Sequence, residues 1–135
     1  MTQIRIKAAS QLLGVSDDTV RRWVSAGRLE MGEDDSGCSV VPGEQLARLA
    51  QELANGSIEE LDPGLGRRSA RNHLTGIVTA VKSDPVMSQV ELQCGRFRVV
   101  SLISTEAVEE LGLQVGAIGT AVIKATNVTI EAGEA

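Results

Sequence analysis

Three widely separated parts of the sequence carry side chains that can bind one oxyanion together. Ser69 and Arg71 are two residues apart, so on a β-strand they project from the same face. Arg71 offers a rigid fork of N–H donors, and Lys124 offers a compact positive charge. Ser104 precedes a predicted short helix, whose free N–H groups and dipole favour an anion. These residue types suit a tetrahedral dianion, which needs positive charge and several directed donors.

A second group of polar side chains lies on a predicted helix over 17–26. Ser16 is a suitable N-cap for this helix, and its apolar positions include Val20, Trp23 and Val24. The remaining positions carry polar and basic side chains that suit the phosphates and base edges of duplex DNA. The candidate DNA-binding residues are Ser16, Asp17, Thr19, Arg21, Arg22 and, after the helix, Arg28.

The elements that position this second group form a helical N-terminal domain. Apolar residues at helical spacing predict a helix over 6–13, which Gly14 ends, and a third helix over 44–54. Between them, 28–31 and 38–41 are β-compatible and flank a polar turn, which predicts a two-stranded hairpin.

The elements that position the oxyanion group are mostly strands. From Leu74 onward the apolar pattern becomes strand-like, with turn residues between the strands. We predict a short helix over 105–111 and five strands, over 74–81, 90–93, 97–103, 117–125 and 127–130. This content favours a small barrel of the oligonucleotide-binding type.

The chain is therefore predicted to be an α+β protein with two domains. The N-terminal domain occupies 1–55, and the barrel domain with one short helix occupies 68–135. Apolar periodicity lapses over 56–67, where Asp62-Pro63-Gly64 and Gly66 form turns, so we interpret this segment as a linker.

Composition excludes several classes of protein. The 135 residues are 42% hydrophobic, but only 1% aromatic, which disfavours base-stacking platforms for single strands. No apolar run approaches the ~20 residues of a membrane span, and the N-terminus lacks the apolar region of a signal peptide. Two cysteines, without metal-ligand spacing, predict neither a disulfide scaffold nor a zinc site, and they favour a cytoplasmic location.

The formal net charge of −5 is unevenly distributed along the chain. Residues 1–29 carry five basic and two acidic side chains, a charge of +3. Residues 30–62 carry one basic and nine acidic side chains, a charge of −8, and the rest is neutral. DNA contact is therefore expected at the N-terminal helices rather than in the acidic segment that follows them.

Residues 6–30 resemble the MerR-type and excisionase-like winged helix-turn-helix family. The resemblance is carried by Ala8-Ala9, Leu12-Leu13-Gly14-Val15-Ser16 and the run from Thr19 to Leu29, Thr-Val-Arg-Arg-Trp-Val-Ser-Ala-Gly-Arg-Leu. It implies binding of double-stranded DNA. One departure is the wing, which is usually basic in the family but here is Gly32-Glu33-Asp34-Asp35-Ser36-Gly37. Phosphates repel such a turn.

Residues 68–130 resemble the molybdate-binding Mop/TOBE family of molbindins and ModE-type regulators. Three segments carry the resemblance: Ser69-Ala70-Arg71-Asn72-His73-Leu74-Thr75-Gly76-Ile77-Val78, then 103–113, then Ile123-Lys124-Ala125-Thr126-Asn127-Val128. It implies a site between protomers for molybdate or tungstate. One protomer supplies Ser69, Ala70, Arg71, Lys124 and Ala125, and its neighbour supplies Ser104. Many members have a hydroxyl where this chain has Ala125 or Ala107, and Thr105 or Thr126 are candidates to replace it.

Together the two resemblances imply a transcriptional regulator that binds double-stranded DNA and responds to molybdate or tungstate. The protein is expected to be a cytoplasmic homo-oligomer, a dimer or a multiple of dimers, that does not bind membranes. No acid–base pair, nucleophile or metal cluster in the sequence suggests an enzyme. Two alternatives stay open. One is a molbindin-like storage protein whose N-terminal domain no longer binds DNA. The other is a phage-type architectural factor in which the barrel only oligomerises.

Overall fold

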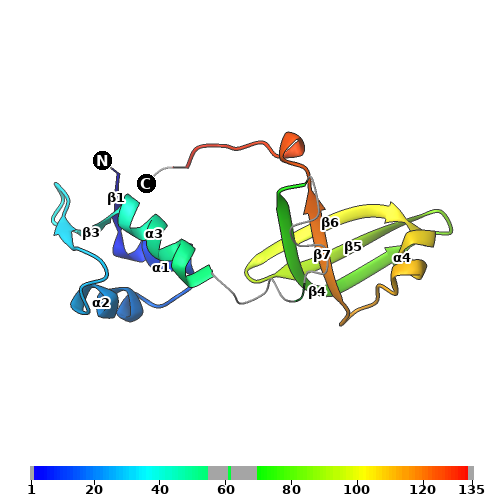
Figure 1. Cartoon of the computed structure of the whole chain (residues 1–135), viewed down its shortest axis with the longest axis horizontal. Helices are drawn as coiled ribbons and strands as arrows, with labels where there is room; N and C mark the ends of the chain where they lie inside the picture. Colours follow the sequence, from blue (N-terminus) through cyan, green and yellow to red (C-terminus); the bar gives the residue numbers. More distant parts are fainter. Residues whose placement is uncertain (1, 55–60, 62–69, 134–135) are drawn as a thin grey trace. The chain divides into compact units, whose positions relative to one another are not determined.

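The computed structural model describes residues 2–54, 61 and 70–133, and the chain divides into two compact units (Figure 1). One unit comprises Met1–Asn55 with Glu131–Ala135, and the other comprises Gly56–Ile130. The predicted linker over 56–67 lies outside the described residues except for Leu61. That part of the domain assignment therefore stays a prediction.

The first unit contains the three predicted helices, α1 (Ile6–Leu13), α2 (Asp17–Ser25) and α3 (Gly43–Ala54). α1 ends at Gly14, whose φ of 68° is the left-handed conformation that glycine adopts at little cost. α2 begins at Ser16, whose hydroxyl accepts a hydrogen bond from the Thr19 N–H. Local sequence therefore determines where these helices start and stop.

α2 ends in a Schellman motif centred on Gly27. The Gly27 N–H donates to the Val24 carbonyl at 3.0 Å, and the Arg28 N–H donates to the Trp23 carbonyl at 2.9 Å. This motif explains why the predicted strand over 28–31 is wrong. The Arg28 N–H is used in this cap, and Leu29 packs its side chain in the core. The hairpin forms later in the chain, with Gly32–Glu33 as its first strand.

The small sheet of this unit has three strands, β1 (Gln3–Arg5), β2 (Gly32–Glu33) and β3 (Ser39–Pro42). Their order is β1-β3-β2, and both pairings are antiparallel. β1 was not predicted, because three residues are too few to show a strand period. The buried core beneath the sheet and helices consists of Ile6, Ala9, Val20, Leu29, Val41, Leu46 and Leu49, with Trp23 and Val24 packed against it.

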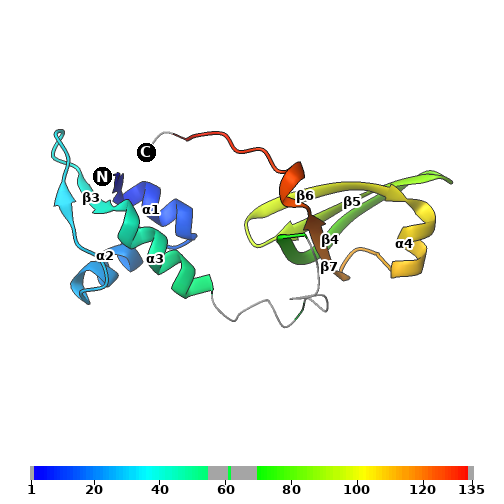
Figure 2. The same cartoon turned by 45° about the horizontal axis from the view of Figure 1, so that its top comes forward.

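The second unit is a curled antiparallel sheet of four strands with one helix (Figure 2). Its order is β6-β5-β4-β7, and α4 follows β6 directly. The elements are β4 (Asn72–Ser83), β5 (Met87–Cys94), β6 (Phe97–Ser104), α4 (Thr105–Leu111), β7 (Ile118–Ile123) and the 3-10 helix η2 (Ala125–Asn127).

The predicted five-stranded barrel is not formed by the described residues. The expected fifth strand over 127–130 has no ladder partner, and β6 and β7 are the two edges of an open sheet. Val128 and Ile130 are exposed, Ile130 at 90%. The alternation of Val128, Thr129 and Ile130 is compatible with a strand, but the segment pairs with neither open edge of the sheet.

The core of the second unit lies against the concave face of the sheet. It consists of Val78, Val90, Leu92, Cys94 and Val108. Cys94 is a small core residue; its thiol donates to the Leu74 carbonyl at 3.4 Å, and burial raises the pKa of that thiol.

Candidate functional site

The pairing of β4 with β7 brings Arg71 and Lys124 to the same end of the sheet. Asn72, the first residue of β4, is the register partner of Ile123, the last residue of β7. The Asn72 side-chain amide also donates to the Ile123 carbonyl at 3.1 Å. Arg71 and Lys124 lie directly outside this pair, and both are exposed. Two cations from distant parts of the sequence therefore meet at one edge, as an anion site requires.

The neighbouring predicted ligands are Ala70 and Ala125. Ala70 is buried, and its carbonyl accepts a hydrogen bond of 2.8 Å from the ring nitrogen Nε2 of His73. This bond gives His73 a structural role. Ala125 is exposed as the first residue of η2, which begins directly after Lys124. Ser69 lies outside the described residues.

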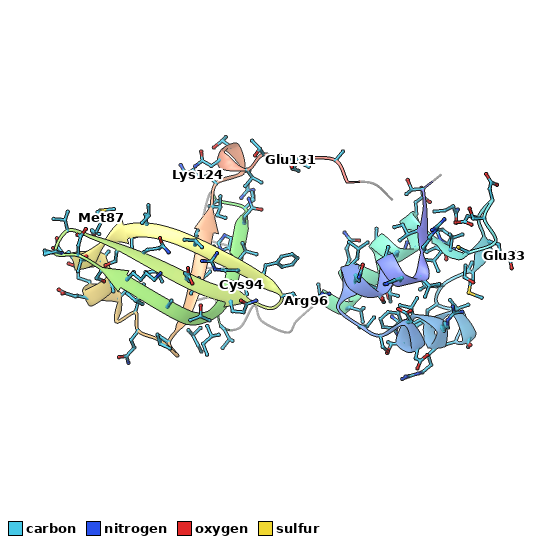
Figure 3. The ribbon with its side chains drawn as sticks, turned by 180° about the vertical axis from the view of Figure 1, so that it is seen from behind. Glu33, Met87, Cys94, Arg96, Lys124 and Glu131 are labelled. Carbon is cyan, nitrogen blue, oxygen red and sulfur yellow. The ribbon has the colours of Figure 1, made fainter. Side chains whose placement is uncertain are left out.

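Ser104, the third part of the predicted site, lies at the other end of the sheet. It ends β6 and is the register partner of Met87, which precedes the pair Ser83–Ser88 at the far end of β4. The twelve residues of β4 separate the two ends by about 36 Å along the strand, at ~3.3 Å for each of eleven steps. Figure 3 labels Met87 and Lys124 at these separate positions. One chain does not bring Ser104 to Arg71 and Lys124.

The side chain of Ser104 is oriented by the helix that it caps. Its Oγ accepts a hydrogen bond of 3.1 Å from the Ala107 N–H. The hydroxyl hydrogen of Ser104 is then available as a donor, which is what an oxyanion needs.

Thr105 cannot supply the missing family hydroxyl in this conformation. Its Oγ1 donates to the Asp84 carbonyl at 2.7 Å and lies 2.8 Å from the Ser88 hydroxyl. Sequence reasoning missed Ser88, which is 1% exposed. The available signal was its place in the inward-facing alternation Ser88, Val90, Leu92, where a polar residue needs partners.

The candidate DNA-binding residues lie on and around α2. Arg21 and Arg22 are exposed on this helix, as is Asp17 in its first turn. The hydroxyls of Ser16 and Thr19 lie 3.0 Å apart, and both belong to the helix cap. The two arginines therefore are the side chains of α2 that suit phosphate or guanine.

Arg28 lies in a polar hollow of about 360 Å³ beside α3. Its guanidinium contacts the Glu52 carboxylate at 3.1 Å, and Arg48 lines the same hollow. Nearby, the Glu30 N–H donates to the Gln45 side chain at 2.8 Å. Glu52 was not singled out from the sequence, because an ion pair across 24 residues has no local signature.

The acidic turn between β2 and β3 is organised by Asp34. Its Oδ1 accepts hydrogen bonds of 2.9 Å from the N–H groups of Cys38 and Ser36, and its Oδ2 accepts one from Arg5. The Cys38 N–H, together with Arg5, holds the pKa of Asp34 below its usual value. Glu33 and Asp35 are exposed (Figure 3, Glu33). One of the three acidic side chains is thus structural.

The inner face of the curled sheet contains an apolar hollow of about 790 Å³. Residues of β5, β6 and β7 and of the segment around the end of α4 line it, among them Leu92, Val99, Ile103, Leu113 and Ala121. Ile118 and Leu111 at its margin are 60% and 68% exposed. Exposed apolar surface of this extent marks an interface more often than a monomer surface.

Two further searches concern the described part of the chain only. No group of three or more His, Cys, Asp or Glu side chains there is arranged to hold a metal ion. None of the helices in residues 2–54 and 70–133 has the length and hydropathy that a bilayer crossing requires.

Comparison with known proteins identifies relatives of the second unit. Residues 68–130 match the TOBE domain family. Molybdenum-pterin-binding protein 3 of Clostridium pasteurianum is 48% identical over 63 residues, which cover 46% of this chain and 93% of that protein. A probable molybdenum-pterin-binding protein of Haemophilus influenzae is 41% identical over 63 residues, covering 46% and 91% of the two chains.

Solved structures include the cytoplasmic molybdate-binding protein ModG with molybdate bound. It is 43% identical, with a TM-score of 0.47, and the match covers 50% of this chain and 49% of that chain. The names of the Clostridium and Haemophilus relatives describe binding proteins, in agreement with the expectation that this chain is not an enzyme.

Proposed function

Because the chain belongs to the TOBE domain family through residues 68–130, we propose that it binds molybdate or tungstate and couples this binding to DNA recognition. The relatives' names support the first half of this proposal, since they describe proteins that bind molybdenum-pterin or molybdate. The single observation that carries it in this chain is the meeting of Arg71 and Lys124 at one end of the sheet. The proposed location is the cytoplasm.

The proposed oxyanion site is shared between two copies of the chain. One copy supplies Ser69, Arg71 and Lys124, with the backbone of Ala70 and Ala125, and a second copy supplies Ser104. The length of β4 between Ser104 and the two cations supports this sharing, since one sheet holds them at opposite ends. Arg71 and Lys124 would neutralise the dianion, and Ser104 would donate its hydroxyl hydrogen.

The apolar surface of the second unit supports a homo-oligomer, a dimer or a multiple of dimers. The hollow of about 790 Å³ and the exposed side chains of Val128 and Ile130 provide apolar area that a second copy can bury. Burial of such area is the main driving force of association. A ligand that bridges two copies then stabilises the assembly through mass action.

The proposed DNA-binding element is α2, the second helix of a winged helix-turn-helix. Its exposed Arg21 and Arg22 support this role, and Arg28 would contact the backbone beside them. In a dimer, two such helices would read half-sites about 34 Å apart. Oxyanion binding between copies would change their spacing and so the fit to DNA.

The oxyanion half is tested by isothermal titration calorimetry with molybdate, tungstate and sulfate. Arg71→Ala is expected to weaken binding of molybdate at least tenfold, because it removes a charged donor. Arg98→Ala removes an exposed cation from β6 and serves as the matched control, because the register Arg98–Gln93–Ile77 places it at the middle of β4, away from both Ser104 and the two cations. Equal affinity of Arg71→Ala and Arg98→Ala would reject the proposed site.

The DNA half is tested by fluorescence anisotropy with a duplex from the promoter of the chain's own gene. The double variant Arg21→Ala/Arg22→Ala is expected to lose specific binding, while Lys82→Ala retains it. Titrations with and without molybdate then measure the coupling between the two sites. Identical DNA affinity with and without molybdate would contradict the proposed regulatory role.

A storage protein is the second candidate, and the exposed acidic side chains of Glu33 and Asp35 favour it. They lie where a DNA-binding wing would approach phosphate, and like charges repel. Tight oxyanion binding with no DNA binding above the non-specific level would support storage over regulation.

A further inference from the structure

A chain of three hydroxyl groups connects β4, β5 and the residue that follows Ser104. The Ser83 and Ser88 hydroxyls are 2.7 Å apart, and the Ser88 and Thr105 hydroxyls are 2.8 Å apart. Thr105 in turn donates to the Asp84 carbonyl at 2.7 Å. We call these three side chains, Ser83, Ser88 and Thr105, the hydroxyl relay.

The direction of every hydrogen bond in the relay follows from its last member. A hydroxyl has one hydrogen, and that of Thr105 is used on the Asp84 carbonyl. Thr105 must therefore accept from Ser88, whose own hydrogen is then used, so Ser88 must accept from Ser83. All three hydrogens are committed, and the relay has a single orientation.

The relay is costly to leave incomplete, because Ser88 is 1% exposed on the apolar face of β5. A buried hydroxyl without a partner loses the hydrogen bonds that it made with water. Here both neighbours satisfy it. Ser88 faces inward beside Val90 and Leu92, a position that alanine could also fill. Compared with alanine, serine adds the hydroxyl that links Ser83 to Thr105.

The relay terminates on the backbone segment that carries Ser104. Thr105 is bound to the β4–β5 turn twice, since its N–H also donates to the Val86 carbonyl at 2.9 Å. The turn itself is fixed by Asp84, whose Oδ1 accepts from the N–H groups of Val86 and Met87 at 2.8 Å each. Ser104 therefore precedes a residue held by both its backbone and its side chain.

We propose that the hydroxyl relay positions Ser104 for the oxyanion and thereby sets the affinity of the shared site. The inference rests on the proposed function. Ser83, Ser88 and Thr105 are positioning residues that do not touch the ligand. The hydroxyl of Thr105 cannot donate to the oxyanion, because it already donates to the Asp84 carbonyl.

The test measures molybdate affinity of the full chain by calorimetry for Thr105→Val, which keeps the branched shape and removes the hydroxyl. We expect affinity to fall about fivefold to tenfold. The matched control is Thr75→Val, which removes a buried hydroxyl that lies 2.8 Å from the half-buried hydroxyl of Thr120. The control is expected to bind within twofold of the parent chain.

Two measurements separate positioning from general loss of structure. Thr105→Ser restores a hydroxyl and is expected to restore affinity. In the background Ser104→Ala, Thr105→Val is expected to cause no further loss, because the relay acts through Ser104. If Thr105→Val does not fold, Ser88→Ala replaces it in the same cycle.

The outcomes distinguish this inference from the proposed function. If Arg71→Ala weakens molybdate binding but Thr105→Val binds molybdate like the parent chain, the relay inference is overturned, while the proposed oxyanion site is supported. Additive losses in the Ser104→Ala background also overturn the relay inference, since Thr105 would then act by another route. Absence of molybdate binding in the parent chain overturns both.

Discussion

Arg5 Nε lies 2.9 Å from Asp34 Oδ2, and this ion pair joins β1 to the turn after β2 across the intervening strand β3. The turn would otherwise be held to the unit only through the pairing of β2 with β3. The same pair neutralises one acidic side chain of the turn. Only Glu33 and Asp35 then oppose the approach of phosphate.

Asp34→Asn is expected to destabilise the first unit at neutral pH and to lose this effect in acid. The folded-state pKa of Asp34 is lowered, so its ionised form stabilises the fold above the unfolded pKa of about 3.9. This contribution to stability is lost as the pH falls through the lowered folded-state pKa of Asp34. Asparagine keeps an acceptor for the Cys38 and Ser36 N–H groups but loses the charge.

Thermal unfolding followed by fluorescence measures this prediction, because Trp23 is the single tryptophan and packs on the first unit's core. The difference in melting temperature between Asp34→Asn and the parent chain should shrink between pH 7 and pH 2.5. Asp35→Asn, an exposed neighbour, is the control and should show little difference at either pH. A constant difference for Asp34→Asn would contradict the role of its charge.

Removing the exposed charges of the turn is expected to strengthen DNA binding, given the proposed function. The double variant Glu33→Gln/Asp35→Asn should raise affinity about threefold to tenfold at low salt, and the gain should fade as salt screens the repulsion. Glu109→Gln/Glu110→Gln on α4 makes a similar change in net charge elsewhere. Equal gains in both double variants would assign the effect to net charge alone.

Glu52→Gln is expected to raise DNA affinity modestly, by about twofold to fivefold. Arg28 lies 3.1 Å from the Glu52 carboxylate, which competes with phosphate for the guanidinium. The control is Glu44→Gln at the other end of α3. In an Arg28→Ala background the gain from Glu52→Gln should vanish in the same anisotropy assay. A loss of affinity on Glu52→Gln would mean that the carboxylate orients Arg28 for DNA instead.

Gly76→Ala is expected to destabilise the second unit by at least about 2 kcal/mol. A Cβ there would overlap the Gln93 carbonyl oxygen and lie 2.8 Å from the Cys94 sulfur, so the backbone of β5 must move. Calorimetry should show a lower unfolding temperature for this unit while the Trp23 fluorescence transition is unchanged. Gly133→Ala, with no atom near its added Cβ, is the control.

Local chemistry could be predicted from the sequence because it acts over a few residues. Ser16 and Ser104 cap the helices that follow them, and Gly14, Gly27 and Gly112 end helices in the left-handed conformation. The predicted strand over 28–31 was wrong for a local reason, since the Schellman motif at Gly27 uses the Arg28 N–H.

The distances between the candidate site residues depend on strand register and on where the chain reverses, and a local sequence pattern does not predict either. Residue types together with the family resemblance predicted Arg71, Lys124 and Ser104 as oxyanion donors. The pairing of Asn72 with Ile123 unites the first two, and the register of β5 with β6 places Ser104 at the opposite end. The partners of Ser88 likewise follow from the register of β5 against β4 and β6. A strand also needs a ladder partner, and 127–130 has strand composition but pairs with neither open edge of the sheet. The sequence by itself determined which side chains can do the chemistry, and the tertiary structure decided which of them meet, because hydrogen-bonded register sets distances that composition and spacing leave open.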